Sequence, residues 1–345
     1  MTVTTLDPTF VLPPNREATE PPEARGLARD EVRLLVSGQG IITHAHFHEL
    51  PRFMRSGDLL VVNDSSTTSA AVDAQVDGID VVLHFSTWLD DGSWVVEVRS
   101  TDGHVADWAR LEAGLKIRLP HGVTATLVEP WLPSGRRLWT ADIRGTASVV
   151  EWLARQGRPI TYSYVRERWS AGYYETVFGR RPGSAEMPSA GRPFTDRLVT
   201  ELVASGIAVA PITLHTGVSS PESGEPPSPE RFAVSAATAR LVEATRAAGH
   251  RVIAVGTTVT RALETVATED GLVRPDAGWT NLVLSTERPT RVVDGLITGW
   301  HAPGASHLDL LEAVVGPQAV REAYDSALKT GYLWHEFGDS ALLLR

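Results

Sequence analysis

The chain has 345 residues, of which 42% are hydrophobic and 21% charged, a composition typical of a globular protein with two domains. The formal net charge of −10 argues against a broad phosphate-binding face, and the absence of cysteine excludes disulfides, thiolate metal sites and a cysteine nucleophile. The sequence has no apolar run near the roughly 20 residues that span a bilayer and no secretory signal, so we expect a cytoplasmic protein with no membrane partner.

The first half of the chain predicts two kinds of β-structure. Apolar runs at Arg33 to Val36 and Leu59 to Val62 predict strands of a larger domain. From about residue 69 the pattern changes to short alternating runs separated by turns such as Asp90-Asp91-Gly92. These runs are Ile79 to Phe85, Trp94 to Val98, Leu115 to Leu119, Val123 to Val128 and Leu138 to Ile143. They predict a small all-β barrel.

After Ser148 the pattern becomes α/β. Predicted helices at Thr195 to Ala204 and Ser235 to Gly249 alternate with buried strands at Ile207 to Leu214 and Arg251 to Val255. This alternation predicts an α/β domain with a mostly parallel sheet and flanking helices. We therefore expect residues 1–68 and 149–345 to form the large domain, residues 69–148 to form an inserted β-barrel, and a ligand to bind between them.

Two features could carry chemistry. The segment Gly256-Thr257-Thr258 lies where a strand turns into a helix, and Arg261 follows one turn later. The free N–H groups and the dipole of such a helix end favour an anion, although an ordinary capped turn has the same pattern. His215 and His301 follow apolar strands, and the ends of strands are where open α/β sheets bind ligands. A histidine with a purely structural role is the alternative at both positions.

The sequence predicts neither a metal nor pyridoxal phosphate. His44, His46 and His48 share one face of a strand, but no cysteine or matching acidic pattern completes a metal site. A pyridoxal Schiff base would have to use Lys116 or Lys329, the two lysines of the chain. Lys116 lies in the strand-rich segment and Lys329 in a C-terminal helical segment, so we expect no such cofactor.

Short recognisable fragments are spread over almost the whole chain. They are Arg33-Leu34-Leu35-Val36, Phe47-His48-Glu49-Leu50-Pro51, Gly57-Asp58-Leu59-Leu60, Asn63-Asp64, Tyr174-Glu175-Thr176-Val177-Phe178, Pro188-Ser189-Ala190-Gly191, Phe194-Thr195, Thr213-Leu214-His215-Thr216-Gly217, Gly256-Thr257-Thr258 with Arg261, Val293-Asp294-Gly295-Leu296-Ile297-Thr298, His301 with Pro303, and Phe337-Gly338-Asp339. In this order and with these spacings, the fragments resemble the S-adenosylmethionine:tRNA ribosyltransferase-isomerase family of queuosine biosynthesis.

The resemblance implies a large α/β domain, an inserted β-barrel, and S-adenosylmethionine as the only cosubstrate. Enzymes of this family transfer its ribosyl part to a 7-aminomethyl-7-deazaguanine base in tRNA and release adenine and methionine. The sulfonium acidifies the carbons beside it, so the protein must chiefly add a positioned base. His215, His301 and Glu230 are the candidate bases, and the sequence does not rank them. The expected substrate-binding residues are Asp64, Gly191, Thr195, Gly256, Thr257, Thr258, Arg261, Asp294 and Asp339.

Five motifs depart from the family. Its His-rich stretch before Glu-Tyr-Tyr is replaced by Pro226-Pro227-Ser228-Pro229 before Glu230-Arg231-Phe232, and Ser285-Thr286-Glu287 stands where a Tyr-Pro-Gly is expected before Val292. The other three motifs each lose one side chain. The family's Asn-Asp-Thr-Arg reads Asn63-Asp64-Ser65-Ser66 here, its Gly-Leu-His-Phe-Thr reads Gly191-Arg192-Pro193-Phe194-Thr195, and its His-Leu-Pro-Lys-Ser-Thr reads His301-Ala302-Pro303-Gly304-Ala305-Ser306. An arginine, a histidine and a lysine are thereby lost. Lost cations weaken contact with an RNA backbone, and a lost imidazole removes a proton-transfer group. We therefore predict a branch of the family that uses S-adenosylmethionine without tRNA.

The predicted reaction of this small-molecule branch is an internal displacement. The aminobutyrate arm of S-adenosylmethionine would cyclise, with 1-aminocyclopropane-1-carboxylate as the favoured product, and methylthioadenosine would leave. The first alternative is a genuine tRNA ribosyltransferase-isomerase that forms epoxyqueuosine. The second is a paralogue that binds the ligand without catalysis. The sequence does not identify the oligomeric state.

Overall fold

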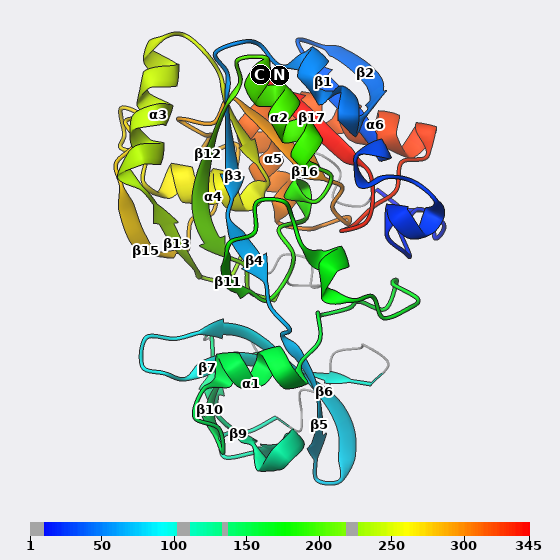
Figure 1. Ribbon diagram of the computed structural model, residues 1–345, viewed down its shortest axis with the longest axis vertical. Helices are drawn as coiled ribbons and strands as arrows, with labels where there is room; N and C mark the ends of the chain where they lie inside the picture. Colours follow the sequence, from blue (N-terminus) through cyan, green and yellow to red (C-terminus); the bar gives the residue numbers. More distant parts are fainter. Residues whose placement is uncertain (1–9, 102–110, 133–136, 219–226) are drawn as a thin grey trace.

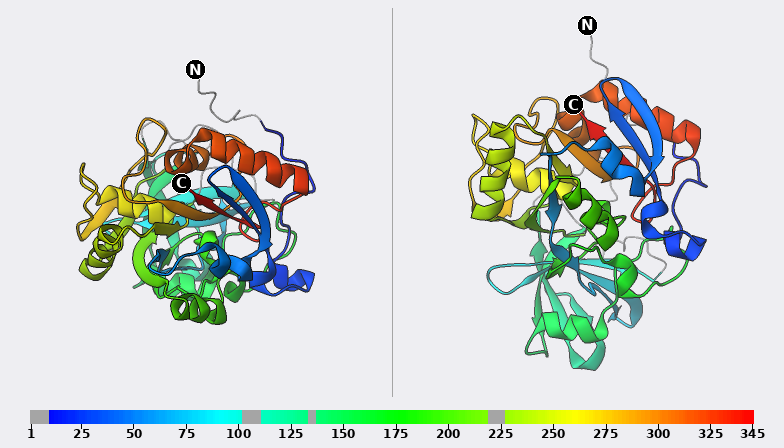
Figure 2. Two further views of the ribbon diagram at one scale, coloured as in Figure 1. Left: turned by 90° about the horizontal axis from the view of Figure 1, so that it is seen from above. Right: turned by 45° about the horizontal axis from the view of Figure 1, so that its top comes forward.

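The structure, a computed structural model, describes residues 10–101, 111–132, 137–218 and 227–345. It consists of a large α/β domain and a closed β-barrel, which lies below the large domain in Figure 1. The right-hand view of Figure 2 shows the same separation. The expected fold class, an α/β domain with an additional all-β barrel, is therefore confirmed.

The large domain is built on a nine-stranded mixed sheet. Its strands, in order across the sheet, are β15 (Asp276–Thr280), β13 (Glu230–Val234), β12 (Ala208–His215), β3 (Leu59–Asn63), β14 (Val252–Val255), β16 (Gly295–Gly299), β17 (Ser340–Leu344), β1 (Arg33–Gly38) and β2 (Ile41–His46). The four central strands from β12 to β16 are parallel, while β13, β15 and β2 add antiparallel edges and β17 runs antiparallel to β16. β3 and β14 are buried along their whole length, which explains their continuous apolar sequences.

Helices cover both faces of this sheet. They are α2 (Asp196–Ala204), α3 (Ala236–Ala247), α4 (Thr257–Thr265), α5 (His307–Val315) and α6 (Pro317–Thr330). Helices α3 to α6 contribute to one hydrophobic cluster, and α2 contributes Leu198 and Leu202 to another on the opposite face. The predicted cap Thr195 accepts a hydrogen bond from the backbone N–H of Leu198, 3.2 Å away, and so fixes the start of α2. Within the described ranges, no helix has the length and apolarity needed to cross a membrane.

The barrel closes in the strand order β10-β7-β6-β5-β8-β9. Its strands are β5 (Ala71–Val76), β6 (Ile79–Trp88), β7 (Trp94–Ser100), β8 (Lys116–Arg118), β9 (Thr124–Pro130) and β10 (Leu138–Arg144). Helix α1 (Val149–Gln156) places Trp152 and Leu153 in the hydrophobic core of the barrel, so this core includes residues beyond position 148. The barrel also holds a buried charge cluster, in which the Glu97 carboxylate pairs with Arg99 at 2.8 Å and Arg137 at 2.7 Å.

Two chain segments join the barrel to the large domain. The chain leaves through β4 (Ser65–Thr67) and returns through β11 (Arg181–Ser184), and these two strands pair in parallel (Figure 1). A second contact links the barrel to the sheet edge, because Asp90 accepts hydrogen bonds from Arg231 at 2.6 Å and from the Trp279 indole at 3.0 Å. The space between the two domains is thus bounded by a strand pair and by a polar contact.

Candidate functional site

A cavity of about 450 Å³ lies where the central strands of the large domain end. Residues that follow β12, β14 and β16 line one side of it, including Thr216, Gly256 and His301. Tyr162 and Tyr164, from the segment that follows the barrel and α1, line another side. The carboxyl ends of parallel strands are the usual ligand position in open α/β sheets, and the volume suits a small organic molecule.

The turn between β14 and α4 forms a polar part of the cavity wall. Gly256 has φ 96°, a left-handed conformation that a side chain would strain, and its N–H donates to the Ile297 carbonyl of β16 at 2.8 Å. This bond holds the turn against the end of the neighbouring strand. Thr257 and Thr258 open α4 and line the cavity. The first N–H groups of a helix have no acceptor within it, so this part of the wall favours an anionic group such as a carboxylate.

Arg261 and Glu230 form a buried ion pair beside that turn. The Arg261 guanidinium pairs with the Glu230 carboxylate and also donates to the carbonyls of Leu282 at 3.1 Å and of Thr280 and Ser228 at 3.3 Å. Burial raises the pKa of Glu230, while the charge of Arg261 and the Gly217 N–H act in the opposite direction. The pair therefore joins α4 to β13 and β15, with its opposite charges compensating each other.

His301 is stacked on His307 within the cavity wall. Their ring centroids are 4.5 Å apart and their planes differ by 3°. Burial lowers the pKa of His301 well below its ordinary value and lowers that of His307 to about 4, so both imidazoles are neutral at pH 7. The His301 Nδ1 atom is enclosed and has no hydrogen-bond partner among the described residues. A neutral imidazole of this kind can accept a proton from a ligand.

Glu336 and Tyr164 form a second titratable group in the cavity wall, which the sequence did not indicate. The Tyr164 hydroxyl donates to the Glu336 carboxyl at 2.7 Å, and His335 stacks on the Tyr164 ring with centroids 4.2 Å apart. Burial raises the pKa of Glu336 to about 7, against the influence of the Tyr164 hydrogen bond and the charge of Arg192. Because Glu336 and Tyr164 are 172 positions apart, no local sequence pattern reveals this pair.

The structure brings half of the predicted site residues together. His301, Glu230, Gly256, Thr257, Thr258 and Arg261 all line the cavity, whereas His215, Asp64, Gly191, Thr195, Asp294 and Asp339 do not. Instead, the Nδ1 atom of His215 forms a hydrogen bond with the Ser65 hydroxyl at 2.8 Å. The Ser65 hydroxyl also forms a hydrogen bond with the Ser184 hydroxyl at 2.6 Å. This network lies at the strand pair between the domains, since Ser65 belongs to β4 and Ser184 to β11.

The remaining predicted residues hold backbone segments. Asp64 accepts from the Thr213 hydroxyl at 2.6 Å, and Asp294 accepts from the Val252 N–H at 2.9 Å. Gly191 ends a 3₁₀ turn, and the Thr195 hydroxyl donates to Asp30. Asp339 accepts from the backbone N–H groups of Arg33 at 2.9 Å and Leu333 at 2.8 Å, and pairs with the Arg33 guanidinium. These contacts position β1, β12 and β14 around the cavity.

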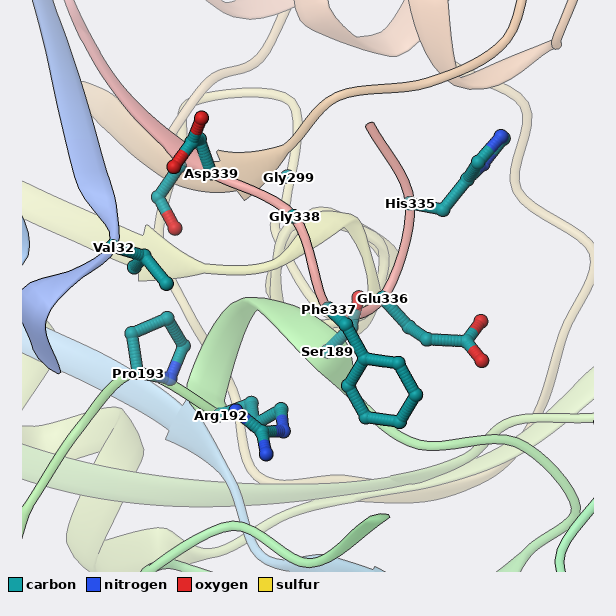
Figure 3. A pocket seen from close by; sticks show the side chains of 11 residues that line it. Val32, Ser189, Arg192, Pro193, Gly299, His335, Glu336, Phe337, Gly338 and Asp339 are labelled. Atoms are coloured by element: carbon teal, nitrogen blue, oxygen red, sulfur yellow. The ribbon is translucent and has the colours of Figure 1, made fainter. Parts of the chain in front are cut away.

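Asp339 also borders a second, much smaller cavity of about 10 Å³, roughly the volume that one water molecule needs. Figure 3 shows it between Val32, Pro193 and the Gly338 segment, with the side chains of His335 and Glu336 directed away from Asp339. Such a volume holds no organic ligand. The 450 Å³ cavity is therefore the candidate site.

The histidines of β2 have other contacts. His44 Nδ1 lies 2.9 Å from the Tyr332 hydroxyl, and His46 Nδ1 lies 2.9 Å from the Glu31 carbonyl. Among the residues that the structure describes, no group of three or more His, Asp or Glu side chains is arranged to hold a metal ion.

Comparison with known proteins identifies the family. A family profile described as "Queuosine biosynthesis protein" matches residues 6–343. The chain belongs to this family. A relative from Moorella thermoacetica, named S-adenosylmethionine:tRNA ribosyltransferase-isomerase, is 35% identical over 97% of the chain and 98% of the relative. One of the same name from Thermosynechococcus vestitus is 32% identical over 97% and 94%.

A solved structure of the family supports the fold. The S-adenosylmethionine tRNA ribosyltransferase of Thermotoga maritima is 26% identical to this chain, with a TM-score of 0.53 over 97% of the chain and 99% of that protein. The predicted resemblance to the queuosine biosynthesis family is therefore confirmed over nearly the whole length.

The three lost side chains belong to different parts of the structure. Gly304, which replaces the lysine, is followed by Ala305 and Ser306, and these two residues line the 450 Å³ cavity. Pro193, which replaces a histidine, borders the 10 Å³ cavity instead. Ser66, which replaces an arginine, lies in β4 between the two domains. The lysine loss is thus next to the wall of the candidate site, and the other two are farther along the fold.

Proposed function

We propose that the 450 Å³ cavity binds S-adenosylmethionine and that the chain acts as an S-adenosylmethionine:tRNA ribosyltransferase-isomerase. The observation that carries the proposal is a ligand-sized cavity at the ends of β12, β14 and β16, in a chain whose named relatives align with it over nearly its full length. These names favour the tRNA reaction over the small-molecule branch that we expected from the lost cations.

The cavity offers two kinds of group to this ligand. The start of α4 at Thr257 and Thr258 would receive the ligand carboxylate, because its N–H groups and dipole favour an anion. His301 would serve as the base that removes a proton from a carbon beside the sulfonium, since its imidazole is neutral and its Nδ1 has no partner among the described residues. Arg261 would position the start of α4 through its bonds to β13 and β15.

A second candidate function is the internal displacement, and one observation favours it. Gly304 stands where the family's motif has a lysine, and its neighbours Ala305 and Ser306, which line the cavity, bring no positive charge. In this reaction a base removes the α-proton, the α-carbon bonds to the γ-carbon as the C–S bond breaks, and methylthioadenosine leaves with the sulfur electron pair. The products would be methylthioadenosine and 1-aminocyclopropane-1-carboxylate.

We further propose that neither reaction requires a resident metal or pyridoxal phosphate. Lys116 lies in β8 of the barrel and Lys329 in α6, and neither lines the cavity. A Schiff base at the candidate site would therefore have no lysine to form it, which supports this proposal.

Product analysis separates the candidates. The protein is incubated with S-adenosylmethionine, with and without tRNA that carries 7-aminomethyl-7-deazaguanine. Adenine, methionine and epoxyqueuosine in the tRNA would establish ribosyl transfer. Methylthioadenosine and 1-aminocyclopropane-1-carboxylate formed together without tRNA, and absent from a sample without the protein, would establish the displacement and refute the first proposal. Unchanged S-adenosylmethionine in both samples would support a non-catalytic role. A His301→Asn variant should lose whichever activity is found, while a variant of the distant surface residue Lys116 should keep it.

A further inference from the structure

The wall of the 450 Å³ cavity carries more negative than positive charge. Among its described lining residues, Glu186, Glu230 and Glu336 are acidic and Arg261 is basic. Arg261 pairs with Glu230, so these two charges compensate each other. Glu186 accepts a hydrogen bond from the Tyr162 hydroxyl. A cavity with this surplus attracts a cationic ligand.

The negative charge of Glu336 has little compensation from nearby groups in the described part of the chain. One of its carboxyl oxygens accepts from the Tyr164 hydroxyl at 2.7 Å, while Oε1 is enclosed and has no hydrogen-bond partner among the described residues. No salt bridge to Glu336 forms within the described part of the chain. An enclosed carboxylate without a cation is costly, so the carboxyl holds a proton part of the time.

The neighbours of Glu336 leave its charge open to a ligand. Arg192 acts on it from a distance but pairs with Glu23 at 2.8 Å. His335 stacks on Tyr164 and lies 3.4 Å from the Glu17 carboxylate. Tyr164 stays protonated, because burial and the charge of Glu336 raise its pKa. Burial likewise raises the pKa of Tyr174, so this hydroxyl is neutral too.

We propose that Glu336 is the counter-charge for a positively charged group of the ligand, and that ligand binding expels the proton that its carboxyl holds in the unliganded protein. The inference rests on the proposed binding of S-adenosylmethionine, which carries a sulfonium and an ammonium group. A cation brought close to a carboxyl favours its ionised form, so the proton leaves as the ligand enters. Glu336 would then distinguish charged ligands from neutral ones of the same shape.

Calorimetry in buffers of different ionisation enthalpy measures the protons released on binding. Because the pKa of Glu336 is about 7, binding of S-adenosylmethionine at pH 7 should release about half a proton, and more at pH 6. Glu336→Gln should abolish this release and leave only protons that the ligand itself exchanges. Tyr164→Phe removes a hydrogen bond that stabilises the carboxylate, so its release at pH 7 should exceed that of the wild type. The two variants thus change the signal in opposite directions.

Two analogues identify the charge. S-adenosylhomocysteine keeps the ammonium but lacks the sulfonium, and methylthioadenosine lacks both. Release with S-adenosylmethionine alone assigns Glu336 to the sulfonium, and release also with S-adenosylhomocysteine assigns it to the ammonium. Equal proton release with all three ligands would overturn the counter-charge role of Glu336. The same conclusion would follow if S-adenosylmethionine bound but the proton release were unchanged in Glu336→Gln and Tyr164→Phe. In both cases the proposed binding of S-adenosylmethionine would remain intact. No binding of S-adenosylmethionine would overturn the proposed function and this inference with it.

Discussion

Replacement of Arg261 by methionine would leave the Glu230 carboxylate buried without its cation. The Arg261 side chain is 8% exposed and that of Glu230 14% exposed, so water would compensate little of the lost charge. Glu230 would avoid the free-energy cost of an unpaired buried charge by taking up a proton. For a carboxyl with an ordinary pKa of 4.5, this costs about 3.4 kcal/mol at pH 7, at roughly 1.4 kcal/mol per pH unit. The lost bonds to the Leu282 and Thr280 carbonyls add about 1 kcal/mol each.

The pH dependence tests this reasoning. In Arg261→Met the folded-state pKa of Glu230 lies above its unfolded value, so stability is lost as pH rises from about 4.5 toward 7. At pH 5 the charge contribution should shrink to about 0.7 kcal/mol. Urea unfolding followed by circular dichroism at pH 5 and pH 7 gives both values. The matched control, Glu230→Gln with Arg261→Met, should be about 3 kcal/mol more stable than the single variant at pH 7 and nearly equal to it at pH 5. A stability loss that is the same at both pH values would refute the argument.

Three further predictions concern the site and the barrel. His301→Asn should lower kcat by about 100-fold to 10,000-fold while calorimetry shows unchanged S-adenosylmethionine affinity; unchanged kcat would exclude His301 as the base. Gly256→Ala should cost about 1–2 kcal/mol in urea unfolding because φ is 96° there, and a neutral effect would contradict the strain. Although burial raises it, hydrogen bonds from His84 and Arg99 and the charge of Arg137 bring the pKa of Glu97 to about 2, so wild-type stability should fall as pH drops from about 4.5 toward 2. Glu97→Gln should cost about 3–5 kcal/mol at pH 7 and remove that pH dependence.

The sequence predicted best where one local signal was sufficient. Continuous apolar residues located β3 and β14, and Thr195 located the start of α2. Turn residues between alternating runs located most barrel strands. β5 (Ala71–Val76) was not predicted, because no turn residues mark its start and its short alanine side chains weaken the alternation. The sheet is also more mixed than predicted, since strand order and direction depend on contacts between distant segments.

The site was predictable to the extent that it lies at strand ends. Gly256 follows β14 directly, His301 comes two positions after the end of β16, and both line the cavity. His215 is the last residue of β12, yet its imidazole bonds Ser65, a residue 150 positions away that no local pattern connects to it. His307 was missed because its role comes from stacking on His301 across a turn. Glu336 was missed because packing against Tyr164 creates its environment.

The position of β3 between β12 and β14 affects how the protein is made. β3 is synthesised early, but its neighbours in the sheet are completed only at residues 215 and 255. The barrel ends at residue 144, about 110 residues before β14 is complete, and at roughly 5–20 residues per second the ribosome needs about 5 to 20 seconds to make that stretch. During this interval β3 lacks its β12 partner until residue 215 and its β14 partner until residue 255, so at least one edge of this apolar strand stays unpaired. The nascent chain should therefore depend on chaperones most strongly in the window between barrel closure and the emergence of β14.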